Sequence, residues 1–166
     1  MLSSIRFFLR ASALGARQAP LMSTKASEAP KFDPEMVKAY NKMSANHRHA
    51  NGPWLKMRDA VLAYHAEAAG GSKKSLVILD LASGPGEPAA TIAAALPGCT
   101  VVATDVSEDM VAAAAKATAA LPNLSAVVAD AQNLSGFEDQ SVDVITCCYG
   151  CELQTPVNLE MLHLTA

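Results

Sequence analysis

Positive charge is missing from the C-terminal part of this 166-residue chain, because no lysine or arginine follows Lys116 while six acidic residues do. The basic residues of the other end precede the first acid, Glu28, and are Arg6, Arg10, Arg17 and Lys25. Proteins that bind nucleic acids through the phosphates need a basic patch on the folded domain. We therefore expect no nucleic-acid partner.

Long apolar runs and paired metal-ligand motifs are also missing. No stretch is long and apolar enough to span a membrane. The four cysteines, Cys99, Cys147, Cys148 and Cys151, have no second cysteine or histidine pair at zinc-site spacing, so we predict no metal site. In an organellar matrix or cytosol we expect these thiols to stay reduced and to pack as small hydrophobes.

Acidic residues are absent from the first 27 residues, which carry arginines, serines and apolar residues. Arg6 and Arg10 interrupt the apolar residues, which argues against a secretory signal. This composition is typical of a mitochondrial targeting peptide, with a plastid one as the alternative. We predict that residues 1–27 are such a leader, outside the fold; a disordered tail of a cytoplasmic protein is the other interpretation.

The rest of the chain has the composition of one soluble domain, with 51% hydrophobic and 17% charged residues over the whole sequence. Residues 28–72 form an N-terminal segment in which we expect helices over 34–47 and 54–69. Residues 73–166 predict strands over 76–81, 100–104, 124–129 and 142–148, with helices over 88–96 and 107–120. This alternation predicts an α/β fold, a Rossmann-like parallel sheet with helices on both faces.

A glycine-rich turn follows the first of these strands. Residues 76–81 are apolar except for Asp80, and Ser83-Gly84-Pro85-Gly86 leads into an alanine-rich helix with Pro88 in its first turn. Glycines let the backbone approach a ligand, and a helix N-terminus offers unpaired N–H groups. The pattern predicts a site for a nucleotide-like cofactor.

Three aspartates end three successive strands: Asp80, Asp105 and Asp130. Ligands of open α/β sheets bind at the carboxyl ends of the strands. An acid within an apolar run is costly to bury unless something pairs with it or solvates it. Asp105 lies about twenty residues beyond the glycine turn, where an acid commonly takes ribose hydroxyls.

These segments resemble a known family. Residues 79–89 look like motif I of the class I S-adenosylmethionine-dependent methyltransferases, and residues 102–110 look like their second motif. Residues 128–134 resemble the adenine-contacting segment, and residues 137–148 the loop and fourth strand that follow it. The resemblance covers about residues 40–153 and leans toward small-molecule methyltransferases, including those acting on quinone precursors.

The resemblance implies a role for each matching position. The loop over 82–86 would pass the methionine portion of the cofactor, and Asp80 would help to order its amino group. Asp105 would accept hydrogen bonds from both ribose hydroxyls, and Asp130 from the adenine amine, with the backbone of Ala131 facing the ring. The implied cofactor-binding residues are Asp80, Ala82, Ser83, Gly84, Pro85, Gly86, Asp105, Val106, Met110, Asp130, Ala131 and Cys148.

Some of these positions keep two interpretations. Met110 either packs on the adenine or belongs to the helix core. Cys148 would present its backbone to the methionine part, and Tyr40 either closes the site or packs. The family often has glycine where this chain has Ala82, so a positive φ there would be strained.

A nicotinamide-dependent oxidoreductase is the rival interpretation, because residues 84–89 satisfy G-x-G-x-x-A and Asp105 suits a ribose. That pattern usually begins with glycine directly at the strand end, and it leaves Asp130 without a role. The methyltransferase interpretation is therefore preferred.

The implied reaction is direct displacement of the methyl group from the sulfonium by a small-molecule acceptor. Positioning and desolvation can supply much of the acceleration, so no catalytic acid is obligatory, whereas a hydroxyl or acidic-carbon nucleophile would need a general base. His47, His49 and Glu152 are candidates for a general base by residue type only.

The family fold has seven strands, of which this chain supplies about four. We therefore expect a truncated domain whose fourth strand is an exposed apolar edge, open to association. A non-catalytic cofactor-binding half-domain or an inactive fragment is the alternative function.

Overall fold

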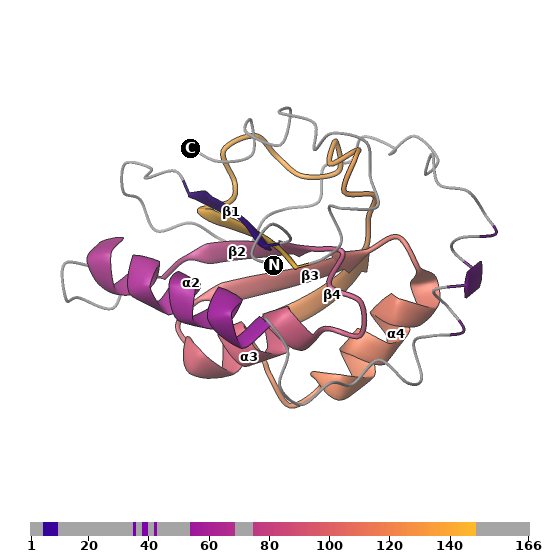
Figure 1. The fold of residues 1–166 in the computed structure, drawn as a ribbon, viewed down its shortest axis with the longest axis horizontal. Coiled ribbons are helices and arrows are strands. Elements are labelled where there is room, and N and C mark those ends of the chain that lie inside the picture. The colour runs from indigo at the N-terminus through magenta and orange to yellow at the C-terminus, as the bar shows by residue number, and fades with distance from the viewer. Residues whose placement is uncertain are drawn as a thin grey trace.

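The structure is a computed structural model that describes residues 5–9, 35, 38–39, 42, 54–68 and 75–148. Glu35, Lys38, Ala39 and Lys42 are helical, and Lys38 pairs with Glu35 at 2.7 Å on the surface. The elements drawn in Figure 1 are β1 (Ile5–Leu9), α2 (Trp54–Ala68), β2 (Val77–Leu81), α3 (Glu87–Ala95), β3 (Thr100–Asp105), α4 (Glu108–Ala117), β4 (Leu124–Val128) and β5 (Val144–Cys148).

The strands form one sheet in the order β1-β5-β2-β3-β4, in which β2 to β5 run parallel. The chain proceeds outward from β2 through β3 to β4 and then returns to the other side of β2 as β5. The direction of winding thus reverses between β2 and β5, and ligands of open α/β sheets bind at such a switch point. The predicted parallel sheet of about four strands is confirmed.

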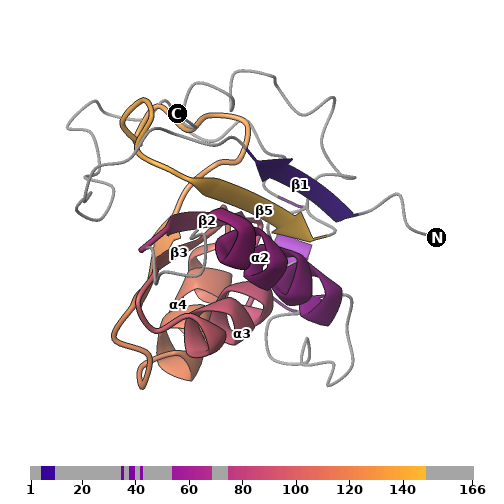
Figure 2. The same cartoon turned by 90° about the vertical axis from the view of Figure 1, so that its left-hand side faces the viewer.

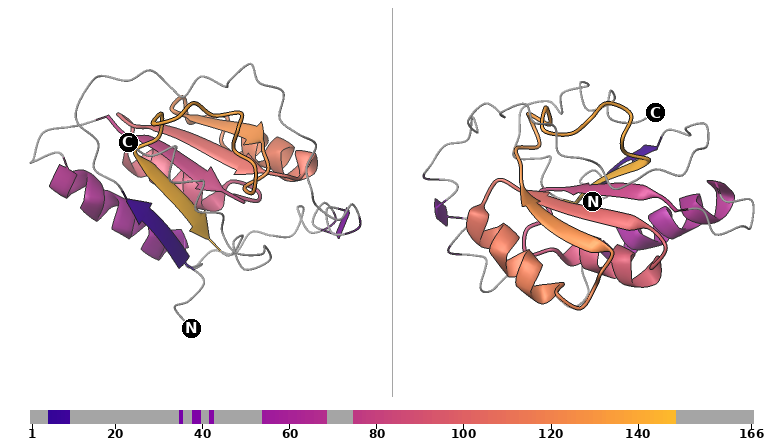
Figure 3. Two further views of the ribbon diagram at one scale, coloured as in Figure 1. Left: turned by 90° about the horizontal axis from the view of Figure 1, so that it is seen from above. Right: turned by 180° about the vertical axis from the view of Figure 1, so that it is seen from behind.

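Two apolar clusters occupy the two faces of the sheet, because successive side chains of a strand point to opposite sides. One cluster joins the sheet to α2 and α3 and includes Ile78, Val101, Val144, Val61, Ala89 and Ile92. The other lies under the loop over 129–143 and includes Leu79, Val102, Ile145, Leu134 and Phe137. Figure 1 and the right-hand view of Figure 3 show α2, α3 and α4 on the same side of the sheet.

Element boundaries agree with the sequence to within a few residues. Ser107 is the N-cap of α4, as predicted, and its hydroxyl accepts a hydrogen bond from the Met110 N–H at 3.2 Å. The helix ends at Ala117, where the hydroxyl of Thr118 donates to the Ala114 carbonyl at 2.7 Å. Strand β5 begins at Val144, directly after Asp143, whose Oδ2 accepts from the Val77 N–H at 2.8 Å.

The edge of β5 is covered, which corrects the expectation of an exposed edge. Strand β1 pairs with β5 antiparallel, from Ile5 opposite Cys148 to Leu9 opposite Val144, and Figure 2 shows the two side by side. An unpaired edge presents a row of N–H and C=O groups, and an extended segment rich in Ile, Phe and Leu satisfies them. The prediction that residues 1–27 lie wholly outside the fold is therefore wrong for Ile5–Leu9, whereas their targeting role stays a prediction.

Candidate functional site

The glycine turn lies at the carboxyl end of β2, where it was predicted. Three of its residues have positive φ: Ala82 at 50°, Gly84 at 57° and Gly86 at 93°. The Ser83 N–H donates to the Thr104 carbonyl at 2.8 Å, and the Gly86 N–H donates to the Ser83 carbonyl at 3.0 Å. The turn is thus tied to β3 and closed on itself, and the anticipated strain at Ala82 is present.

The two glycines are needed for different reasons. A Cβ added at Gly86 would lie 3.0 Å from the Ala114 Cβ, so glycine lets α3 start directly against α4. A Cβ added at Gly84 would meet nothing within 4 Å. Gly84 therefore serves the left-handed backbone and leaves space beside the turn that a ligand can approach.

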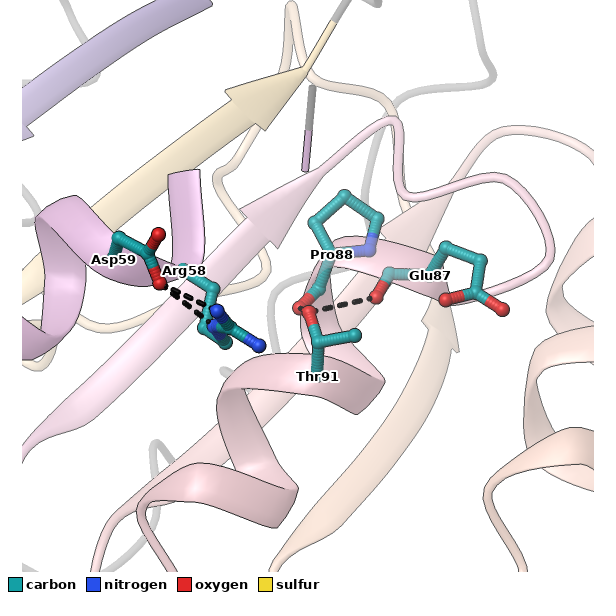
Figure 4. Close-up of polar contacts among 5 residues, drawn as sticks. All are labelled: Arg58, Asp59, Glu87, Pro88 and Thr91. Atoms are coloured by element: carbon teal, nitrogen blue, oxygen red, sulfur yellow. Dashed lines mark hydrogen bonds and ion pairs between the residues drawn. The ribbon is translucent and has the colours of Figure 1, made fainter. Parts of the chain in front are cut away.

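Helix α3 starts directly from this turn. Gly86 is its N-cap and has no side chain with which to cap the first amides, and Glu87 and Pro88 form the first turn. Figure 4 shows the Thr91 hydroxyl folded back on that turn, donating to the carbonyls of Pro88 at 3.0 Å and Glu87 at 3.3 Å. The same view shows the ion pair of Arg58 with Asp59 on α2, at 2.6 Å.

Asp105, at the end of β3, contacts the turn directly. Its Oδ2 accepts from the Gly84 N–H at 2.9 Å, and its Oδ1 accepts from the Ser107 N–H at 2.9 Å. Burial raises the pKa of this carboxyl above its usual value, and the backbone N–H groups that it accepts from oppose the rise. Asp105 is therefore held in one orientation between the glycine turn and the start of α4.

Asp80 lies beneath the turn and is fully buried. Its Oδ1 accepts from the Thr146 hydroxyl at 2.6 Å, whereas its Oδ2 and the Ser83 Oγ are buried without a hydrogen bond. Burial raises the pKa of Asp80 to about 6. The hydroxyls of Ser83 and Thr146 and the Ala89 amide oppose the rise, although Ser83 lies near the carboxylate outside hydrogen-bonding geometry, and the charge of Asp105 adds slightly to it.

Asp130 comes after β4 and is buried. Its Oδ1 accepts from the Gln132 N–H at 2.8 Å, and its carbonyl accepts from the Asn133 N–H at 2.9 Å. The Ala129 N–H donates to the Asp105 carbonyl at 3.0 Å, which ties the ends of β3 and β4 together. The three predicted aspartates therefore lie along one edge of the sheet, as expected.

The remaining predicted residues differ in their exposure to solvent. Val106 is half-buried beside Asp105, and Pro85 is half-buried in the turn. Met110 is only 2% exposed and Ala131 only 6%, so packing is the better-supported interpretation of the Met110 side chain. Cys148 is a half-buried thiol at the end of β5, and burial together with the charge of Asp80 raises its pKa to about 11.

Several predicted positions fall outside the described residues: Tyr40, His47, His49, Cys151 and Glu152. Cys99 and Cys148 carry reduced thiols, as expected, but Cys147 is disulfide-bonded, so the expectation of reduced thiols is wrong there. Within the described part of the chain, no group of three histidine, cysteine or carboxylate side chains is arranged to hold a metal. No helix in that part is long and apolar enough to cross a membrane.

Thr146 was missed from the sequence. It is fully buried in β5 and paired in register with Asp80. The signal that could have found it is a hydroxyl inside the otherwise apolar run over 144–148, beside a strand that carries a buried acid.

The arrangement favours a positively charged or hydroxyl-rich ligand. Carboxylates stand at the ends of β2 and β3 and just beyond β4, and Lys116 is the only basic residue between positions 75 and 148. Carboxylates accept hydrogen bonds from hydroxyl and amino groups, and a low-dielectric surrounding strengthens their attraction for cations.

Comparison with known proteins identifies the same segment. A family model described as a methyltransferase domain matches residues 78–164. The YcgJ protein of Bacillus subtilis has 22% identity and a TM-score of 0.53, over 66% of this chain and 46% of that one. A putative S-adenosylmethionine-dependent methyltransferase of Methanococcus maripaludis has 20% identity and a TM-score of 0.52, over 87% of this chain and 63% of that one.

A methyltransferase of Aquifex aeolicus, also described as dependent on S-adenosylmethionine, has 21% identity and a TM-score of 0.50, over 81% of this chain and 68% of that one. A search of curated protein sequences finds no significant match. These structures share the fold, and the chain spans about half to two thirds of the length of each.

Proposed function

Because the chain belongs to the methyltransferase domain family, we propose that it binds S-adenosylmethionine at the glycine turn and transfers the methyl group to a small-molecule acceptor. The observation that carries the proposal is the contact between Asp105 and Gly84 at 2.9 Å. It fixes an acid beside a positive-φ turn at the carboxyl edge of a parallel sheet. That combination suits a ligand with a ribose next to a charged end.

The residues present fit this cofactor. The open space at Gly84 lets the methionine portion approach the backbone, and Ser83, Pro85 and Gly86 shape the same turn. Each oxygen of Asp105 already accepts one backbone N–H and retains capacity for a second donor, which the two ribose hydroxyls would supply.

The adenine would lie toward β4. Asp130 would accept from the exocyclic amine, while Ala131 and Val106 would border the ring. Asp105 and Asp130 belong to neighbouring strand ends that the bond from the Ala129 N–H to the Asp105 carbonyl holds together. Cys148 would lie on the other side, beside the methionine portion.

When bound, S-adenosylmethionine supplies an electrophilic methyl group on a positively charged sulfur. The described residues would bind and orient it, and the proton that a hydroxyl or amine acceptor loses would pass to solvent or to a base outside those residues. The carboxylates of Asp80 and Asp105 favour the positive charge of the donor before transfer. Alignment of the acceptor with the methyl carbon and exclusion of water would supply the acceleration.

The acceptor class and the cellular location are further parts of the proposal. The resemblance in residues 79–148 favours small molecules such as quinone precursors. The acid-free composition of residues 1–27 favours import into mitochondria. A cofactor-binding half-domain without turnover is the competing possibility.

A methyl-transfer assay tests the proposal. The full chain is incubated with S-adenosylmethionine labelled in the methyl group and with a panel of small phenols, quinols and amines. We expect label in at least one acceptor, lost in Asp105→Ala and retained in Asp109→Ala, an exposed acid in the first turn of α4. Tight cofactor binding without transfer would support the half-domain, and the absence of both would contradict the proposal.

A further inference from the structure

Thr146 and Asp80 form a buried pair at the switch point of the sheet. They lie opposite each other in the register of β5 and β2, and both are fully buried. The Thr146 hydroxyl donates to Asp80 Oδ1 at 2.6 Å, a distance typical of a strong hydrogen bond to a charged oxygen. This bond fixes the orientation of the carboxylate.

The second carboxylate oxygen of Asp80 has no hydrogen-bond partner. Oδ2 is buried and accepts no hydrogen bond, and the nearby Ser83 Oγ is also without one. A buried carboxylate with an unpaired oxygen is costly, so a native structure that keeps one usually has a use for it. The position of the pair beneath the glycine turn indicates where that use lies.

We propose that Thr146 is a positioning residue for cofactor binding: by holding Asp80 Oδ1, it fixes the carboxylate beneath the turn and keeps the charge of Oδ2 available to a cationic ligand. The inference rests on the proposed function, because it assumes a positively charged cofactor on the turn. Thr146 itself does not need to touch the cofactor.

The groups around Asp80 show why this hydrogen bond matters for the ionised form of the carboxylate. Asp105 at the end of β3 and Cys148 at the end of β5 interact electrostatically with Asp80, and Glu87 is the acid of the neighbouring helix start. The charge of Asp105 disfavours the ionised carboxylate, and neither the Cys148 thiol nor Glu87 offers it a positive charge. The charged form is supported by Thr146, by Ser83 and by the Ala89 amide.

The experiment measures the affinity of the full chain for S-adenosylmethionine from about pH 5 to 8, a range that brackets the carboxyl titration. Binding should weaken as the pH falls through about 6, where Asp80 takes up a proton. In Thr146→Val the midpoint should move upward by about one pH unit, because the ionised carboxylate loses a charge-assisted hydrogen bond. Thr146→Ser should keep the wild-type midpoint.

Thr104→Val is the matched control. The Thr104 hydroxyl is also buried, but it donates to the backbone carbonyl of Asp80 at 3.1 Å and not to the carboxylate. Its loss should leave the midpoint unchanged. An equal shift in Thr104→Val and Thr146→Val, or no shift in either, would overturn the inference. Thr146→Ala serves as a second hydroxyl-free variant if the valine does not fold.

A carboxyl-carbon NMR titration of Asp80 in the ligand-free protein tests the role of Thr146 separately from the proposed function. If the wild type binds the cofactor but Thr146→Val leaves the Asp80 titration unchanged, the role of Thr146 is refuted and the proposed function stands. If the wild type binds no cofactor at any pH, both the proposed function and the part of Thr146 in binding fail, whatever the titration shows.

Discussion

The Asp105 carboxylate accepts a hydrogen bond from the Gly84 N–H at 2.9 Å, which joins the end of β3 to the glycine turn after β2. The same carboxylate accepts from the Ser107 N–H at the start of α4. One side chain thus fixes the turn, the strand end and the next helix relative to each other. The shape of the proposed cofactor site depends on it.

Replacing Asp105 should therefore weaken cofactor binding, because its carboxylate both shapes the site and would accept from the ribose hydroxyls. In Asp105→Asn one acceptor oxygen becomes an amide donor, which faces either a backbone N–H or a ribose hydroxyl. We expect the affinity for S-adenosylhomocysteine to fall by about 10- to 100-fold, as for loss of a charge-assisted hydrogen bond. Titration calorimetry measures it, and Asp109→Asn on the exposed first turn of α4 is the control. Equal affinities of the two variants would contradict the role of Asp105.

Asp80→Asn should stabilise the protein in a pH-dependent way. The pKa of Asp80 rises from 3.8 to about 6 on folding, so its contribution to stability is complete below about 3.8 and is lost as the pH rises through about 6. Asn keeps an oxygen for Thr146 without a buried charge. We expect the free energy of unfolding of Asp80→Asn to exceed that of the wild type by an amount that grows between those pH values and levels off at roughly 3 kcal/mol.

Urea denaturation of both proteins across that range measures this difference. An advantage that is the same at low and neutral pH would show that the buried charge is not the cause. The same variant should bind the cofactor more weakly, since it lacks the negative charge beneath the turn.

Gly86→Ala should destabilise the fold more than Gly84→Ala. Both glycines have positive φ, which costs an alanine about 1 kcal/mol. Only at Gly86 does the new Cβ also meet Ala114, at 3.0 Å. We expect a loss of about 2–4 kcal/mol for Gly86→Ala and about 1 kcal/mol for Gly84→Ala in chemical denaturation.

A partial recovery in the double variant Gly86→Ala with Ala114→Gly would identify the steric part of that loss. If the two single variants are equally stable, the contact between α3 and α4 does not require a glycine at position 86.

Removing residues 1–9 should expose the edge of β5. Without β1, the backbone groups of Val144–Cys148 lose their partner strand, and an apolar parallel strand without a cover associates readily. We expect the mass measured by light scattering to rise with concentration in the shortened chain and to rise less in the full chain. Arg6→Ala, which keeps the strand, is the control, and equal masses of the full and shortened chains would show that β1 does not protect this edge.

The sheet and the glycine turn could be predicted because they depend on local patterns. The strand from Val77 carries apolar residues on both faces, the turn contains Gly84 and Gly86, and Ser107 is a typical N-cap. Each of these features depends on residues that are adjacent in the sequence. The strain at Ala82 was anticipated from the family resemblance, because the family often has glycine at that position.

The pairing of Thr146 with Asp80 could not be predicted because it joins residues 66 positions apart through the register of two strands. For the same reason the cover that β1 gives to β5 was missed: the composition of residues 5–9 is that of a leader, and only the free edge of β5 gives them a strand partner. Long-range register decides both, and a single sequence does not state it.

Calorimetric titration of the full chain at neutral pH with S-adenosylhomocysteine, and separately with NAD, tests the central claim most directly. The proposed site predicts one molecule of S-adenosylhomocysteine bound per chain with a Kd on the order of micromolar, and no measurable heat with NAD. Binding of NAD without binding of S-adenosylhomocysteine would contradict it, because Asp105 and the glycine turn would then serve a dinucleotide.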